Sequence, residues 1–426
     1  MPEGELDQLD ALLARYERAG TREDRRDVWV ANHPPANYLL ALPLVTVGAA
    51  IDGGRGPLLA MRLLSATAMA MTVVAVGALG ARLLPVRPAA AAGAAVLMAS
   101  LGQVAQVGAL AYSDALGALA WTTCLVVAAT IVRRPPGGID RRLVFISAAV
   151  VTFAVLTRAS TLPAAAIVGL AWCLAVWRAH RSGEALAPSL RGLSLCVIAP
   201  LVVAGPFYLR NRALYGSLTA DRVLLDKFDR LPGPSLADQL QPRQLYELIG
   251  DEMFGRLRQS VALAGGLGTR VTVAIAIGAL VAAVVSLRRR PWRPTTSGLL
   301  LLAGCVAASL ALLVAVGRFR AAGGFFHVRY LVPTLPVMLV AIAGGLTRLG
   351  RRPWPLAPAV AAVALVQGIL LWRYLDVLDR AIRTPALAAP SWGATTATVL
   401  LSAWAVLLAL ATWLTLSLPV EEIDGG

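Results

Sequence analysis

The chain has 426 residues, of which 58% carry apolar side chains and 15% carry charged ones. This composition is too apolar for a soluble protein of such length, and it predicts a polytopic membrane protein. A net charge of +15 could suit nucleic acid, but the arginines occur in short clusters between apolar runs, as topology determinants do, so we expect no nucleic-acid partner. The four cysteines lie in apolar runs without CxxC spacing, which favours neither a disulfide nor a zinc site.

Residues 1–56 are predicted to form an outward-facing segment with amphipathic and interfacial helices. Residues 1–30 place leucines at helical spacing among charged side chains, which predicts a short amphipathic helix and a linker. Asn32 and His33 precede two prolines, which remove two backbone donors and favour extended backbone. We expect both side chains on a rigid turn at the membrane edge, either as part of a site or as a plain turn. Residues 38–51 are apolar but fall short of the roughly 20 residues that cross a bilayer, which predicts an interfacial or re-entrant helix.

Eleven apolar stretches follow that are candidates for membrane-spanning helices. They cover residues 57–80, 88–109, 114–132, 143–157, 161–177, 192–208, 269–287, 298–316, 331–347, 354–372 and 395–417. Six of them define a region over residues 57–208, an extracytoplasmic loop region covers 209–268, and five more lie within 269–426. The predicted fold class is an all-α polytopic membrane protein, a bundle of about 11 transmembrane helices with short interfacial helices.

Loops rich in arginine alternate with loops that have few, and positive charge marks the cytoplasmic side of a membrane. The arginine-rich set lies around residues 82–87, 133–142, 178–191, 288–293 and 348–352. The opposite set, together with residues 1–56, is expected to face outward from a bacterial cytoplasmic membrane. Export of an N-terminal segment with six arginines and no preceding span is unfavourable, so we expect a further first span ahead of it, which would make twelve.

Polar side chains stand at the outward ends of several predicted spans. Asp114 opens a span, and a carboxylate costs up to about 2.5–3.5 kcal/mol at full membrane depth, so it should have a partner or a task, with helix N-capping as the alternative. Arg158 lies between two spans on the side that the charge rule disfavours. Its planar guanidinium suits a phosphate group, and snorkelling to the interface is the alternative.

The same reasoning covers a second set of candidates: Arg62, Arg210, Asn211, His327, Arg329 and Tyr330. A lone histidine at the mouth of a span is most often structural. Grouped with arginines and a carboxylate, it becomes a candidate ligand or proton carrier.

Such a set at the outer edge of a helical bundle suits an anionic lipid headgroup. Nucleotide sugars and ATP are not available outside the cytoplasmic membrane, so group transfer there needs a donor already anchored in the bilayer, such as a polyprenyl-phosphate sugar. Arginines would stabilise the departing phosphate, and a carboxylate would take the proton from the acceptor hydroxyl.

Five segments, in this order, resemble motifs of the C class of integral-membrane glycosyltransferases (GT-C), in particular the family-39-like group related to protein O-mannosyltransferases and aminoarabinose transferases. They are residues 32–40 (NHPPANYLL), 60–65 (AMRLLS), 113–116 (SDAL), 208–216 (YLRNRALYG) and 329–336 (RYLVPTLP). The resemblance implies a GT-C-like helical bundle, a polyprenyl-phosphate sugar donor, and a lipid, glycan or protein acceptor. It departs from the family in one respect, because no acidic pair after a first span precedes His33.

By this resemblance Asp114 would line the donor site or help to hold a divalent metal, His33 would face the lipid phosphate, and arginines would be its counter-charges. The catalytic candidates are Asp114 and His33. The substrate-binding candidates are Asn32, Arg62, Arg158, Arg210, Asn211, His327, Arg329 and Tyr330. Two other readings stay open: a scaffold without activity, for which the missing acidic pair speaks, and a lipid-linked saccharide transporter or polymerase. A transporter should place ionisable residues at mid-bilayer, whereas here they lie near span ends.

Overall fold

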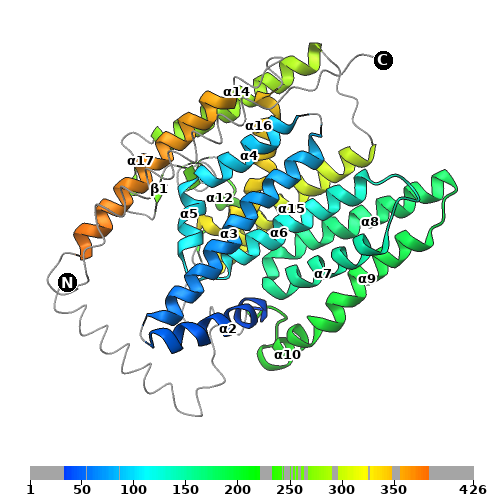
Figure 1. Cartoon of the computed structure of the whole chain (residues 1–426), viewed down its shortest axis with the longest axis horizontal. Helices are drawn as coiled ribbons and strands as arrows, with labels where there is room; N and C mark the ends of the chain where they lie inside the picture. Colours follow the sequence, from blue (N-terminus) through cyan, green and yellow to red (C-terminus); the bar gives the residue numbers. More distant parts are fainter. Residues whose placement is uncertain are drawn as a thin grey trace.

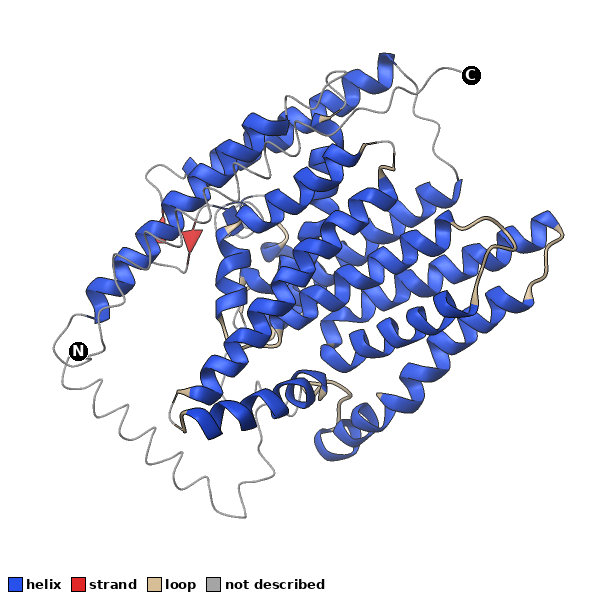
Figure 2. Ribbon diagram, viewed as in Figure 1, coloured by secondary structure: helices blue, strands red, loops and turns tan. Residues whose placement is uncertain are grey.

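The computed structural model describes most of the chain between residues 33 and 382. The described residues are 33–53, 55–85, 87–220, 233–241, 243, 250, 253–254, 256–257, 261–262, 267–289, 296–324, 327–347 and 356–382. Nearly all of them belong to helices (Figure 2). The predicted helix within residues 1–30 and the predicted span over 395–417 lie outside the described residues.

The first described elements form a tight helical hairpin. Helix α2 (Ala36–Ile51) begins directly after the two prolines and folds back on α3 (Gly56–Leu83) (Figure 1). Gly48 and Gly56 bring the two backbones into direct contact, because a Cβ atom on either glycine would overlap the backbone of the other. Small residues allow this close approach where apolar helices pack in a membrane. Helix α2 is apolar and 16 residues long, so the short helix predicted over 38–51 is present.

The central bundle is built from seven further helices. They are α4 (Pro88–Ser100), α5 (Gly102–Ala109), α6 (Asp114–Arg133), α7 (Arg141–Thr157), α8 (Leu162–Ser182), α9 (Ala187–Val203) and α10 (Gly205–Tyr215), with a single 3-10 turn, η2 (Ala159–Thr161), ahead of α8. Helix α6 lies at the centre and packs against α3, α7, α8 and α15 (Figure 1). Six of its fifteen buried residues are alanine or glycine, and Trp121 is fully buried on it.

The C-terminal half adds further helices and a 3-10 segment, and α15 and α16 pack against helices of this bundle. They are α14 (Leu267–Arg289), α15 (Thr296–Ala321), the 3-10 segment η5 (Val328–Thr334), α16 (Leu335–Leu346) and α17 (Leu356–Ile382). The region between α10 and α14 contributes a short helix, α12 (Leu236–Gln239), and two strands of two residues each, β1 (Arg256–Leu257) and β2 (Val261–Ala262), paired antiparallel. The all-α fold class is therefore confirmed, apart from this one small hairpin.

Six helices in the described part of the chain are long and apolar enough to cross a membrane, or up to eight spans if each of two bent pairs counts as one. The predicted count of eleven is thus not confirmed. The stretches predicted over 88–109 and 192–208 each correspond to a bent pair rather than to one straight helix, α4 with α5 at 61° and α9 with α10 at 45°. The helix predicted over 354–372 continues to residue 382.

A side chain from the far end of the sequence supports the first bend. Leu101 has extended backbone between α4 and α5, so the first amide of α5 lacks a helical partner. Gln367 of α17 accepts a hydrogen bond from the Gly102 N–H at 3.0 Å and donates one to the Phe254 carbonyl at 2.6 Å. Gln367 is buried, and its amide satisfies both backbone groups.

Arginines at the opposite end of α6 from Asp114 hold helix C-termini. Arg133 donates to two carbonyls of the last turn of α3 at 3.0 and 3.3 Å, and Arg178 donates to two carbonyls of the last turn of α6. Arg87 donates to the Thr347 carbonyl at the end of α16 at 2.6 Å. A cation at a helix C-terminus satisfies free carbonyls and complements the helix dipole.

Candidate functional site

Four segments that are far apart in the sequence meet at one end of the bundle. They are the turn before α2, the start of α6, the turn between α7 and α8, and η5. Helix α6 has 20 residues and so a length of about 30 Å, which separates this end from the arginine-rich end described above. The helix geometry therefore brings His33, Asp114, Arg158 and Arg329 to one place.

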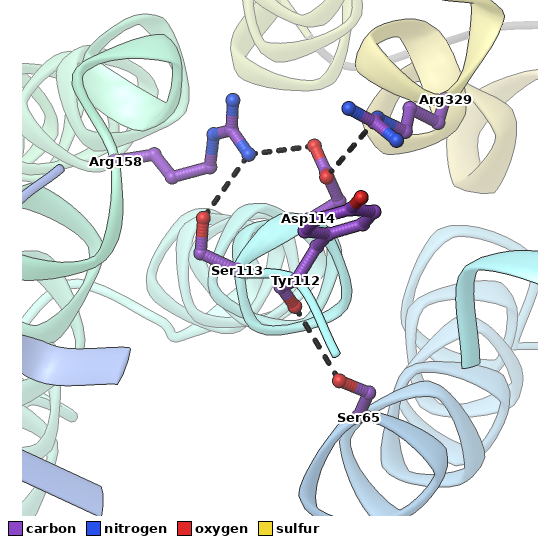
Figure 3. Close-up of polar contacts among 6 residues, drawn as sticks. All are labelled: Ser65, Tyr112, Ser113, Asp114, Arg158 and Arg329. Atoms are coloured by element: carbon purple, nitrogen blue, oxygen red, sulfur yellow. Dashed lines mark hydrogen bonds and ion pairs between the residues drawn. The ribbon is translucent and has the colours of Figure 1, made fainter. Parts of the chain in front are cut away.

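Asp114 is the first residue of α6 and the centre of the cluster (Figure 3). Its Oδ1 accepts a hydrogen bond from Arg158 Nη1 at 2.6 Å, and the same nitrogen donates to Ser113 Oγ at 3.2 Å. Only 6% of the Asp114 side chain and 16% of the Arg158 side chain are exposed. Gly117, one turn into α6, leaves room for the Arg158 stem, since a Cβ there would lie 3.0 Å from Arg158 Cδ.

A second guanidinium reaches the same carboxylate from η5. Arg329 Nε lies 3.3 Å from Asp114 Oδ2, but its direction does not make a hydrogen bond, so this buried N–H is left without an acceptor. The Arg329 guanidinium lies over the Tyr112 ring at 4.5 Å and over the Tyr330 ring at 5.3 Å from each centroid. The Arg158 guanidinium also lies over the Tyr330 ring, 5.5 Å from its centroid. Aromatic rings hold guanidinium groups in this way by cation–π attraction.

His33 stands at the edge of the cluster, half-buried ahead of α2. Burial and the positive charge of Arg158 lower the pKa of its imidazole from 6.5 to about 4, with Asp114 opposing the shift and Arg329 adding to it. Both burial and a nearby cation disfavour the charged form. His33 is therefore neutral at pH 7 and offers one N–H donor and one free nitrogen.

The cluster has an excess of positive charge. Two guanidinium groups share one carboxylate, which leaves a net charge of +1 beside a neutral imidazole. A guanidinium binds phosphate or carboxylate oxygens through paired N–H groups, so a monoanionic ligand would complete the charge balance. A divalent cation does not fit this donor set, because both Asp114 oxygens already face guanidinium groups. Among the residues that the structure describes, no three or more His, Cys, Asp or Glu side chains gather as a metal site.

The geometry also bears on two alternatives from the sequence, helix N-capping by Asp114 and snorkelling by Arg158. Ser113 occupies the N-cap position of α6 without a side-chain capping bond, and its hydroxyl accepts from Arg158 instead. The side chain of Asp114 is likewise engaged by arginines. Arg158 does not snorkel to solvent, since its guanidinium is held by Ser113 and Asp114.

The remaining predicted residues are placed as follows. Tyr330 belongs to the cluster, and exposed His327 lies edge-to-face against its ring with centroids 6.3 Å apart. Arg62 on α3 and Arg210 on α10 are exposed, and among the described residues neither forms an ion pair with Asp114. Buried Asn211 donates to the Leu218 carbonyl at 3.4 Å, a local contact at the end of α10. Asn32 lies outside the described residues, and the roles of all these candidates stay predictions.

The sequence motifs include Ser65 and Ser113, but neither these two residues nor Tyr112 was a candidate site residue. Ser65 Oγ on α3 donates to the Tyr112 carbonyl at 3.4 Å, which ties the segment before α6 to α3 (Figure 3). The available signal was the proximity of Tyr112 and Ser113 to Asp114 in the chain. Ser65 ends the motif over residues 60–65, but its contact with Tyr112 could not be predicted, because 47 residues separate the two.

No protein-family model matches the chain, and no curated protein matches it significantly. Solved structures of similar fold include ArnT from Cupriavidus metallidurans, both apo and bound to undecaprenyl phosphate, each with 16% identity and a TM-score of 0.48 over 90% of this chain. The Archaeoglobus fulgidus oligosaccharyltransferase, in complex with Zn and sulfate, has 13% identity and a TM-score of 0.45 over 83% of this chain. The chain spans 62% of the length of ArnT and 47% of the oligosaccharyltransferase.

Both neighbours are GT-C glycosyltransferases, the class that the sequence motifs resemble. Identities of 13–16% and TM-scores below 0.5 leave the activity of this chain to be argued from its own residues.

Proposed function

We propose that this protein is a membrane glycosyltransferase that moves a sugar from a polyprenyl-phosphate donor to an acceptor on the outer face of a bacterial cytoplasmic membrane. The observation that supports this most directly is the net charge of +1 on a largely buried cluster at one end of a membrane bundle. A phosphodiester anion is the charge that such a cluster lacks.

Arg158 and Arg329 are the groups that would bind the donor phosphate. As the bond from the sugar C1 to the phosphate oxygen breaks, its electron pair goes to that oxygen, and the two guanidinium groups stabilise the charge. The free Nε–H of Arg329 is one donor that a phosphate oxygen could satisfy.

Asp114 and His33 have different tasks in this proposal. Both oxygens of Asp114 already face guanidinium groups, so we assign it the positioning of Arg158 and Arg329. His33 is neutral and would take the proton of the acceptor hydroxyl as its oxygen bonds to C1. A bound phosphate would offset the arginine charges and raise the pKa of His33 toward its usual range, which makes it a better base when donor is present.

The charge rule supports the outward orientation. Arginines that cap helix ends lie at the opposite end of the bundle from the cluster, and positive loops favour the cytoplasmic side. The site would then face a compartment without nucleotide sugars, where a lipid-anchored donor is required.

The test measures lipid binding and sugar transfer with the protein in nanodiscs. Undecaprenyl phosphate is the first probe, because ArnT has been crystallised with it. Arg158→Gln and Arg329→Gln are each expected to weaken its binding by about 10- to 100-fold, the worth of a charge-assisted hydrogen bond. Arg191→Gln is the matched control, since Arg191 is an exposed arginine near the start of α9, at the other end of the bundle.

Transfer is followed in membranes with a radiolabelled polyprenyl-phosphate sugar as donor. Loss of transfer in the two cluster variants, with normal transfer in the control, is the expected result. Binding without any transfer would favour the scaffold or transporter reading. Equal binding by all variants, with each correctly inserted, would refute the site.

A further inference from the structure

Tyr112 is an exposed residue beside buried charged groups of the cluster. The residue is 46% exposed, whereas Asp114 is buried and Arg329 is half-buried. Its ring lies against the Arg329 guanidinium, 4.5 Å from the Cζ atom to the ring centroid (Figure 3). An exposed aromatic ring therefore stands directly beside the charged groups that would bind phosphate.

The ring is also held in place. Its backbone carbonyl accepts a hydrogen bond from Ser65 Oγ on α3, and the chain enters α6 two residues later. The cation–π contact with Arg329 occupies one face of the ring. Tyr330 is less accessible than Tyr112, because two guanidinium groups and the His327 ring contact it and it is half-buried.

We infer that Tyr112 is the platform on which the sugar of the donor packs, a role that rests on the proposed function. In a glycosyl phosphate the sugar is joined to phosphorus through a single oxygen. If the phosphate is bound by Arg158 and Arg329, the sugar must lie within one ring width of them, which is where Tyr112 stands. The C–H groups of a sugar ring form an apolar face that packs on an aromatic face, while its hydroxyls stay in water. Tyr112 then positions C1 and contributes to the choice of sugar, and it takes no part in proton transfer.

The experiment compares undecaprenyl phosphate with undecaprenyl phosphate that carries glucose, mannose or arabinose. Wild type is expected to bind at least one glycosylated lipid more tightly than the bare lipid phosphate. Tyr112→Leu is expected to lose this preference, roughly fivefold, beyond any change that the lost ring contact with Arg329 causes in the binding of bare undecaprenyl phosphate. Tyr112→Phe, which keeps the ring, is expected to retain the preference.

Trp177→Leu is the matched control. Trp177 is also an exposed aromatic residue stacked against an arginine, Arg181 at 5.0 Å, but it lies near the far end of α8. Its loss should leave the preference unchanged.

The possible failures are separable. If wild type binds neither lipid, the proposed function is wrong. If Tyr112→Leu weakens the bare lipid as much as the glycosylated ones, the ring only supports Arg329, and the inference is wrong. If Tyr112→Leu keeps the preference, or if wild type has none, the inference is wrong while the phosphate site stands.

Discussion

Substitutions of Asp114 and Arg158 can remove charged groups from the ion-pair cluster either with or without a change in its net charge. Wild type has a net charge of +1 from Asp114, Arg158 and Arg329. Asp114→Asn raises it to +2, Arg158→Gln lowers it to 0, and the two substitutions together restore +1. The four proteins therefore separate the effect of net charge from the effect of a broken ion pair.

The structure sets the size of the expected stability changes. Asp114 lies 2.6 Å from one guanidinium nitrogen and 3.3 Å from the other, and its side chain is 6% exposed. In an effective dielectric near 20 these distances correspond to a gross attraction of roughly 6 and 5 kcal/mol, most of which offsets desolvation. Breaking a buried pair from one side costs about 3–5 kcal/mol, because it leaves a buried charge without its partner.

Asp114→Asn removes the carboxylate from two guanidinium groups and is thus expected to lower the free energy of unfolding by about 3–5 kcal/mol. Arg158→Gln keeps the pair between Asp114 and Arg329 and should cost less. The double variant should lose less than the sum of the two single variants, because Asp114→Asn then leaves only Arg329 without its carboxylate. The coupling free energy should exceed about 2 kcal/mol. Thermal unfolding in nanodiscs, followed by the fluorescence of the ten tryptophans, is the measurement.

Binding of undecaprenyl phosphate by the same four proteins tests the charge argument. The double variant should bind more tightly than Arg158→Gln alone, although it has no more guanidinium groups, because its net charge is again +1. Additive losses of stability, or a double variant that binds no better than Arg158→Gln, would refute the reasoning.

Three further predictions follow from single contacts. The pKa of His33 is about 4 in the folded protein and 6.5 ordinarily, so only the unfolded chain binds this proton as the pH falls from about 6.5 to about 4. The free energy of unfolding should therefore drop by up to about 3 kcal/mol over this range. In His33→Gln the melting midpoint should depend less on pH over the same range. Gln367→Leu should lower the free energy of unfolding by about 1–3 kcal/mol for each backbone group left without its side-chain partner. Limited proteolysis should then cleave the variant faster than wild type. An unchanged cleavage rate would contradict the role of Gln367 at the bend. Gly192→Ala should cost about 1–3 kcal/mol, because its Cβ would lie 2.5 Å from the rigid ring of Trp172, whereas Gly169→Ala, with no atom within 4 Å, should not lower the melting midpoint.

The apolar windows of the sequence were enough to predict the helical class and the position of most described helices. The bend at Leu101 could not be predicted, because no proline or glycine pair marks it and its free amide is satisfied by Gln367, 265 residues away from Gly102. The continuation of α17 to residue 382 was not predicted for a different reason. Charged residues after 372 end the apolar stretch of the sequence, but they do not end the helix.

The site was predicted from a local signal, namely charged residues on the side of the membrane that the charge rule disfavours. That signal singled out Arg158 and Arg329, which meet at Asp114. It applied equally to Arg62 and Arg210, which are exposed on α3 and α10. A charge pattern reports the end of a helix at which a residue lies, but the face of the helix depends on packing that is set by distant segments.

Arginines at the two ends of the bundle have different electrostatic surroundings, and this difference makes one end the candidate site. Arg87, Arg133 and Arg178 donate to carbonyl groups at helix C-termini, so each meets a partial negative charge that the backbone supplies in the absence of any ligand. Arg158 follows the last residue of α7 and Arg329 belongs to η5, but both guanidinium groups reach the first residue of α6, where the helix dipole offers positive potential instead, and they have one carboxylate between them. Two cations beside a helix start are unfavourable unless an anion joins them. Asp114 supplies one anionic charge, and an anionic ligand would supply the second, which is the physical reason to expect one there.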